Sequence, residues 1–543
     1  MMRPLLVFIF FIYSLLSTAQ SILWEKSYGG KHAEFLYDAI PTPDYGFILA
    51  GSSISNKNGN KTDDSKGNLD YWVWKMNANG ELDWQKSFGG SGVDLLQSIQ
   101  LTRDAGFILA GTSTSTADFD KKNTSKGGAD YWIIKLDATG NEMWQKTIGG
   151  SGDEKLQSLL QTPDGGYIIA GSSSSDATPE EKESLSNPFY GKTEDSRGNL
   201  DYWVVKLTKE GTIAWQKTIG GLYVDELKSV ALSKDGGYVL GGYSNSPASG
   251  DKLQDNMGIG DYWIVKLDTS GTIVWQKTIG GDQDDNLFAL IATKDGGYVA
   301  GGNSNSGSSG SKSKANGKGT DFWVVKLDDQ GSMLWQETYD FGKIDVLNSV
   351  VENPDGTLLL GGYAQSEVAS RASATGNLRA SATDKEGIND YIALKISATG
   401  ESLWNKIVGS KGEDVLKKLI ETRDGGYLLA GTSNGGNSRD KSSGIGGTDF
   451  WVVKLKDTAK PEKLKTTIEA LPNPVESFTN IVVNFDYTEG TATLYDLNGR
   501  RLQSQKITGS HTIPMQLNGM PAGVYIVSIQ TNTQEESIKV IKK

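Results

Sequence analysis

The sequence contains no cysteine and only two histidines among its 543 residues. Without cysteine the chain forms no disulfides, so its stability must come from burial and hydrogen bonding, which a large repeated core can supply. His32 is the only histidine before residue 500, which excludes histidine-based metal sites and disfavours a Ser-His-Asp arrangement. The Gly-Gly pairs stand between expected strands and do not precede helices, so they do not form phosphate-binding loops. We assign no catalytic residue and no metal ligand from the sequence.

Long hydrophobic runs are absent except at the start of the chain. Leu5–Leu16 is largely apolar, follows a single charge at Arg3, and precedes Ser17 and Ala19 at the spacing of a signal peptidase site. We interpret residues 1–19 as a secretory signal cleaved after Ala19, and we expect no membrane span in the mature chain. The formal net charge of −12 argues against nucleic acid or an anionic membrane surface as the main partner, because like charges repel.

The sequence is rich in one repeated pattern. "DYWVVKLTKEGTIAWQKTIGG" at Asp201–Gly221 returns sixty residues later as "DYWIVKLDTSGTIVWQKTIGG" at Asp261–Gly281. Such self-similarity at a fixed period indicates one structural unit repeated along the chain. The phrase occurs seven times, beginning at Asp70, Asp130, Asp201, Asp261, Asp321, Asp390 and Asp449.

Each unit contains four short strand-like segments. In one unit they are "LQSLLQT", "YIIAGSS", "DYWVVKL" and "TIAWQKTIG", separated by Gly- and Asp-containing turns or a long polar loop. This pattern is typical of an all-β fold, and four-stranded sheets repeated around an axis form a β-propeller. The repeat opens with a fourth-strand phrase at Trp24 and ends after a third-strand phrase at Leu455. We therefore predict a seven-bladed β-propeller over residues 20–456, closed by its N-terminal strand; an open solenoid is the alternative, but we see no polar end caps.

The aromatic phrases carry a resemblance to a known group. All 14 tryptophans lie in them, and we expect these side chains to pack between blades. From Trp24 to Leu455 the chain resembles secreted bacterial β-propeller repeats of this length, which implies a fold but little about activity. The sixth unit departs most from the pattern, because "DYIALKI" lacks the tryptophan and "ETYDFG" from Glu337 replaces "KTIGG" before it.

The repeat stops after Leu455. Residues 457–468 are polar and lysine-rich and read as a linker, whereas "LPNP", "ATLYDLNGRRL" and "MPAGVYIVSIQT" in residues 469–543 predict a small β-sandwich. These phrases resemble the C-terminal sorting domain of the type IX secretion system of Bacteroidetes-like bacteria. The resemblance implies handling by the type IX secretion machinery and export across the outer membrane, with the protein secreted or held at the outer cell surface.

One recurrent acid begins the expected innermost strand of each unit, four residues after the Gly-Gly phrase or its equivalent. A leucine always follows two residues later. Under a structural interpretation, each carboxylate accepts backbone N–H bonds from its own glycine-rich loop. Under the other interpretation, the acids form a ring at the mouth of the channel that binds a cation or a cationic ligand. The seven candidates are Glu34, Asp94, Glu154, Asp225, Asp285, Asp345 and Asp414.

Two features break the symmetry of the repeat. The loops between second and third strands lengthen to 29 residues at Ser172–Leu200 and to 27 at Tyr363–Asn389. These inter-strand loops are rich in oxygen-bearing side chains, so calcium is an alternative cofactor, although the spacing does not match an EF-hand loop. Two residues after the recurrent leucine, five units have a small residue, but the first has Asp38 and the seventh has Lys418. Because those two units should be neighbours across the closure, we predict an ion pair between them.

The leading hypothesis is a secreted or cell-surface propeller that acts as a binding or interaction module for an extracellular glycan or protein. The alternative is an extracellular polysaccharide-degrading enzyme that uses carboxylates near the channel mouth. Two or three acids converging in a deep pocket, unequal among the blades, would favour the enzyme. Seven equivalent acids would favour binding. A structural surface-layer component, which would self-associate, is the third hypothesis.

Overall fold

The computed structural model describes residues 20–178, 191–365, 389–457 and 467–543. All regular secondary structure in these residues is β-strand, as predicted. Within the described ranges there is no helix long and apolar enough to cross a membrane. The predicted signal sequence at residues 1–19 lies outside the described residues, as do residues 179–190 and 366–388 of the two longest loops and residues 458–466 of the predicted linker.

Residues 20–457 contain seven four-stranded antiparallel sheets within the described ranges, here numbered one to seven along the chain. The first strands are β2 (Glu34–Pro41), β6 (Asp94–Leu101), β10 (Glu154–Gln161), β14 (Asp225–Leu232), β18 (Asp285–Ala292), β22 (Ile344–Glu352) and β26 (Asp414–Glu421). The second strands are β3 (Phe47–Ser53), β7 (Phe107–Ser113), β11 (Tyr167–Ser173), β15 (Tyr238–Ser244), β19 (Tyr298–Ser304), β23 (Leu358–Gln365) and β27 (Tyr427–Ser433).

The third and fourth strands complete each sheet. The third strands are β4 (Asp70–Met76), β8 (Asp130–Leu136), β12 (Asp201–Leu207), β16 (Asp261–Leu267), β20 (Asp321–Leu327), β24 (Asn389–Ile396) and β28 (Asp449–Asp457). The fourth strands are β5 (Leu82–Phe88), β9 (Glu142–Ile148), β13 (Ile213–Ile219), β17 (Ile273–Ile279), β21 (Met333–Tyr339), β25 (Ser402–Val408) and, for sheet seven, β1 (Gln20–Tyr28).

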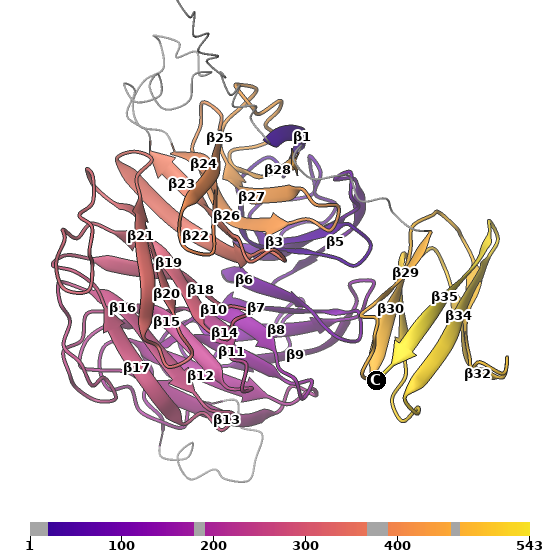
Figure 1. Ribbon diagram of the computed structural model, residues 1–543, viewed down its shortest axis with the longest axis horizontal. Helices are drawn as coiled ribbons and strands as arrows, with labels where there is room; N and C mark the ends of the chain where they lie inside the picture. Colours follow the sequence, from indigo (N-terminus) through magenta and orange to yellow (C-terminus); the bar gives the residue numbers. More distant parts are fainter. Residues whose placement is uncertain (1–19, 179–190, 366–388, 458–466) are drawn as a thin grey trace, which may run out of the picture.

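The first strand of the chain completes the last sheet of the repeat. β1 pairs with β28 in antiparallel register, with Gln20 opposite Asp457 and Tyr28 opposite Phe450, and Figure 1 shows the two strands together. The predicted pairing of the N-terminal strand is therefore confirmed. Each first strand also contacts the first strand of the next sheet, and β26 of sheet seven contacts β2 of sheet one.

Aromatic residues of the third strands join neighbouring sheets. All seven positions of β16 are buried, as expected for an apolar strand covered on both faces. The ring of Tyr262 lies 4.9 Å from that of Trp323 in the next sheet, and the Tyr262 hydroxyl donates a 3.1 Å hydrogen bond to the Trp323 carbonyl. The predicted packing of tryptophans between sheets is confirmed for the six that are fully buried, namely Trp72, Trp132, Trp203, Trp263, Trp323 and Trp451.

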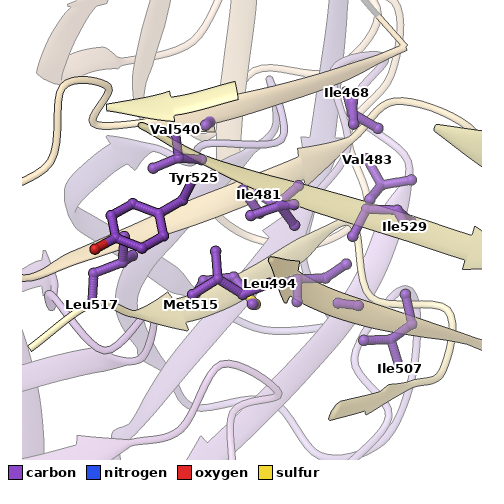
Figure 2. Close-up of a cluster of buried hydrophobic side chains, with 14 of the residues drawn as sticks. Ile468, Ile481, Val483, Leu494, Ile507, Met515, Leu517, Tyr525, Ile529 and Val540 are labelled. Atoms are coloured by element: carbon purple, nitrogen blue, oxygen red, sulfur yellow. The ribbon is translucent and has the colours of Figure 1, made fainter. Parts of the chain in front are cut away.

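The C-terminal region contains two sheets around one core. β29 (Ile468–Leu471), β30 (Phe478–Val483) and β33 (Thr512–Gln516) form one sheet, in that order. The other contains β32 (Arg501–Ile507), β31 (Gly490–Tyr495), β34 (Gly523–Thr531) and β35 (Glu535–Lys542). Figure 2 shows side chains from both sheets meeting in this core, including Ile481, Leu494 and Ile529.

Candidate functional site

A central cavity of about 550 Å³ is lined by residues of all seven first strands. Each of these strands carries a bulge where it pairs with the second strand of its sheet. In sheet one, Leu36 lies opposite Gly51 and Asp38 opposite Ala50, which leaves Tyr37 unpaired between them. The same shift occurs in the other six sheets. A bulge re-aims the extra side chain, and each bulge residue lines the cavity.

The seven bulge residues differ from sheet to sheet, although the leucine before each of them is always buried. They include aromatic, amide and cationic side chains. From sheet one to sheet seven they are Tyr37, Gln97, Gln157, Lys228, Phe288, Asn348 and Lys417. A constant framework therefore presents one variable side chain per sheet to a shared cavity.

The two bulge lysines come from sheets four and seven. Lys228 lies over the Phe288 ring at 5.7 Å and pairs with Glu226 at 2.8 Å. Lys417 lies over the Tyr37 ring at 5.9 Å. Burial lowers the pKa of Lys417, and the positive charge of Lys228 lowers it further. The cavity thus holds two ammonium groups that repel each other and would gain from an anionic ligand.

The cavity is cationic in a chain that is acidic overall. Its charged lining residues are three lysines and one aspartate, a net charge of +2, whereas the whole chain carries −12. The aspartate is Asp38, whose Oδ1 lies 3.1 Å from Lys418 Nζ. The predicted ion pair across the closure is therefore confirmed. Asp38 Oδ2 also accepts a 3.1 Å hydrogen bond from the Ile99 amide, so this carboxylate is already partnered.

The seven acids predicted as a ring are fully buried and do not line the cavity. Each accepts a backbone N–H bond from the loop before its own strand: Gly30 donates to Glu34 at 2.8 Å, and Gly221 to Asp225 at 2.6 Å. Serine hydroxyls from the next loop also donate to several of these acids, as Ser246 does to Asp225 at 3.0 Å. This arrangement fits the structural interpretation and leaves these carboxylates unavailable as an exposed collar. The complete set is Glu34, Asp94, Glu154, Asp225, Asp285, Asp345 and Asp414.

In one of the oxygen-rich loops considered for calcium binding, a lysine side chain contacts the loop carbonyls. In this loop, which contains residues 61–70, the buried Lys61 Nζ donates to the carbonyls of Ser55 at 2.7 Å and Asp63 at 3.0 Å. Asp64 Oδ1 accepts from the Lys57 amide at 2.9 Å. The carbonyl oxygens of Ser55 and Asp63 are therefore bound to an ammonium group.

The bulge residues are not among the candidates predicted from the sequence. Their signal is present in the repeat, because the residue directly after the recurrent leucine varies while the leucine and the acid before it recur. Variation inside a repeated strand marks positions released from packing, but only the bulge shows that these side chains face a cavity.

Comparison with known proteins identifies one segment. Residues 469–543 match a family model described as the secretion system C-terminal sorting domain. Regulatory protein FlaEY of Caulobacter vibrioides is 22% identical over 373 residues, which are 64% of this chain and 37% of that protein. The chain thus spans little more than a third of this curated relative.

Solved structures give only distant likenesses. A fungal alcohol oxidase of the AA5 family, in complex with copper, has a TM-score of 0.41 at 11% identity and covers 96% of this chain and 100% of its own. A Dyadobacter fermentans protein of unknown function has a TM-score of 0.37 at 11% identity, covering 81% and 99%. The Neurospora crassa Pan2 WD40 domain has a TM-score of 0.30 at 13% identity, covering 68% and 90%. What the comparisons assign is the C-terminal sorting domain, which indicates handling by the type IX secretion machinery and export out of the cell.

Proposed function

We propose that this exported chain is a closed seven-bladed β-propeller that binds an acidic sugar in its central cavity, outside the cell. The propeller would extend over residues 20–456, followed by a linker at 457–468 and the sorting domain at 469–543. The ring of contacts between first strands and the pairing of β1 with β28 support toroidal closure.

The observation that carries the binding function is the set of seven different bulge residues around one cavity. Tyr37 and Phe288 offer aromatic faces on which the apolar side of a sugar ring can stack. The amides of Gln97 and Gln157 can donate to hydroxyl groups and accept from them. Lys228 and Lys417 can form charge-assisted hydrogen bonds with a carboxylate.

An anionic group suits this cavity for an electrostatic reason. Burial and the positive charge of Lys228 lower the pKa of Lys417, so the ammonium form is disfavoured without a counter-charge. A bound carboxylate would supply that counter-charge and restore the pKa. A neutral sugar would leave the repulsion in place, so affinity should favour acidic over neutral sugars.

The cavity disfavours the polysaccharide-degrading alternative. Glycoside hydrolysis generally needs two carboxyl groups that flank the scissile bond. Asp38 is the one carboxylate among the lining residues of the described cavity, and Lys418 and the Ile99 amide already occupy it. We therefore propose binding without hydrolysis.

Calorimetric titration of the mature full chain tests this proposal. Oligomers of galacturonic acid serve as the acidic probe and neutral galactose oligomers of equal length as the reference. Lys417→Gln should weaken acidic-oligomer binding by about tenfold to a hundredfold, since a charge-assisted hydrogen bond contributes about 1.5–3 kcal/mol. Lys155→Gln is the matched control, because Lys155 is exposed on β10 and does not line the cavity.

Three outcomes would contradict the proposed function. Acidic and neutral oligomers could bind equally well, Lys417→Gln could bind as the wild type does, or the titrated oligomer could be cleaved. Failure of every sugar to bind would overturn the ligand class and leave a protein partner as the next hypothesis.

A further inference from the structure

The junction between sheets five and six differs from the other six. At those six junctions the residue that follows the fourth strand is a glycine that packs against the aspartate beginning the adjacent third strand. A Cβ added to any of these glycines would overlap with that carboxylate. The six glycines are Gly29, Gly89, Gly149, Gly220, Gly280 and Gly409. At the junction between sheets five and six Asp340 occupies this position, so a third carboxylate stands where the other junctions have a glycine.

A neighbouring substitution accompanies Asp340. Sheet six has Ile392 where the other third strands have tryptophan, so Phe322 lacks the tryptophan partner that Tyr262 has. Phe341, which replaces the second glycine, lies 5.4 Å from the Phe322 ring and packs in the same core cluster as Ile392. An aromatic ring from the loop therefore fills part of this junction.

Three carboxylates converge here. One oxygen each from Asp321, Asp340 and Asp345 lies within 4.8 Å of the others, and no other such group occurs among the described residues. Asp321 and Asp345 are at most 1% exposed, whereas Asp340 is exposed. The cluster thus contains two buried carboxyl groups and one that is exposed to solvent.

Two oxygens in this cluster are buried without a hydrogen-bond partner. Asp321 Oδ2 accepts from the Gly317 amide at 2.9 Å, and Asp345 Oδ2 from the Phe341 amide at 2.6 Å. The Oδ1 atoms of both aspartates have no donor, which is also true of Asp261 and Asp285 at the junction between sheets four and five. At the regular junctions the corresponding third-strand Oδ1 faces a closely packed glycine, which leaves no space for a ligand. Here the third carboxylate replaces that glycine.

The charge of the cluster is under-compensated. Lys312 is the lysine near it, and its ammonium lies close to both Asp285 and Asp321. A cation bound between the three carboxylates would relieve the repulsion among them.

We propose that Asp321, Asp340 and Asp345 bind one calcium ion that joins sheets five and six. Carboxylate oxygens are the ligands that calcium prefers, and water can complete its six to eight ligands through the open side at Asp340. The ion links β20, the segment after β21 and β22 at the junction that lacks the tryptophan. Of the seven recurrent acids, only Asp345 takes part, and the site is separate from the cavity-binding function proposed above.

Calorimetric titration of the chelator-treated full mature chain with calcium chloride tests this site. We expect one calcium per chain with a Kd of about 0.1–1 mM, the range of extracellular calcium modules. Asp340→Asn should weaken binding at least about tenfold, because it removes the one exposed ligand charge. Asp340 is exposed, so this variant should fold; Asp329→Asn, an exposed aspartate of sheet five, is the matched control.

Thermal unfolding gives a second readout. Calcium should raise Tm in the wild type and in Asp329→Asn, and it should have no such effect in Asp340→Asn, because only a ligand bound to the native state stabilises it. Absence of binding up to about 10 mM calcium, ten times the weakest expected Kd, would overturn the proposal. So would equal binding by Asp340→Asn, or magnesium binding as tight as calcium binding. Galacturonate binding should be unchanged in Asp340→Asn, so the two sites can fail independently.

Discussion

The repeat region and the C-terminal region bury their hydrophobic side chains in different ways. Each core cluster of the repeat region takes residues from two adjacent sheets; for example, Tyr202 of sheet three and Trp263 of sheet four share one cluster. The C-terminal core draws only on residues 468–540 (Figure 2). A single sheet of the repeat therefore has no complete core of its own, whereas the C-terminal region has one. Each sheet of the repeat region thus depends on its neighbours for stability, whereas the C-terminal region depends on its own core.

The contact between the two regions is small and polar. Glu469 accepts a 2.6 Å hydrogen bond from the Tyr45 hydroxyl and pairs with Arg423 at 2.6 Å, and Arg423 stacks over the Tyr45 ring at 4.2 Å. Tyr45 has a φ of 64°, a left-handed conformation that five of the other repeats fill with glycine. The contact with the sorting domain thus uses a side chain at a turn position where most repeats have none. Neither core depends on this contact.

Removing one tryptophan that packs between sheets should produce the largest difference in stability between the two regions. Trp263→Ala removes a fully buried side chain, and we expect it to lower the unfolding free energy of the repeat region by about 3–5 kcal/mol. The C-terminal region should be unaffected, because its core contains no residue of the repeat. Amide hydrogen exchange measured by mass spectrometry reports both regions in one experiment.

The control is Val274→Ala, which truncates a side chain that is 56% exposed in β17. Exchange should remain at the wild-type rate throughout this variant. Faster exchange in residues 468–543 of Trp263→Ala would show that the two cores are coupled, contrary to the comparison above.

Most of the repeat region could be predicted from the sequence because one packing problem recurs. The strand phrases, the pairing of β1 with β28 and the Asp38–Lys418 ion pair all follow from the phase of the repeat. The cavity residues could not be predicted, because a bulge at Tyr37 and its six equivalents depends on strand register. The Asp321–Asp340–Asp345 cluster was equally inaccessible, since Asp340 lies 19 residues from Asp321 along the chain and meets it only through sheet packing.

Buried carboxyl groups should make the unfolding free energy of the repeat region depend on pH. The effect should add up along the chain because the same buried aspartate recurs in the repeat units. Burial raises the pKa of Asp261 to about 6, with a smaller contribution from the charge of Asp285, although the hydrogen bond from the Met257 amide and the charge of Lys252 oppose this shift. The unfolded value is about 3.9. Between about pH 4 and pH 6 the native state therefore holds a proton that the unfolded state has lost, and stability falls as the pH rises. Asp261→Asn should remove a slope of about 1 kcal/mol per pH unit in this window.

Denaturant unfolding from pH 4 to pH 8 measures this slope. Asn can still accept the hydrogen bond that the Met257 amide donates at 2.6 Å to Asp261 Oδ2, so the fold should persist. Asp268→Asn, on an exposed turn of the same sheet, should retain the wild-type slope. If Asp261→Asn also retained it, the raised pKa of the buried carboxyl would be disproved.

The smallest expected effect concerns the closure between sheets one and seven, where the repeat uses an ion pair and the inner sheets use small residues. Lys418→Gln leaves Asp38, 6% exposed, with the Ile99 and Ala39 amides and the Ser98 hydroxyl as its hydrogen-bond partners. We expect a loss of about 1 kcal/mol, because the lysine is partly exposed and solvent screens the pair. A double-mutant cycle with Asp38→Asn isolates the interaction itself, and Lys411→Gln, exposed before β26, controls for the loss of one positive charge. A coupling energy near zero would mean that the contact between sheets one and seven depends on apolar packing and not on this ion pair.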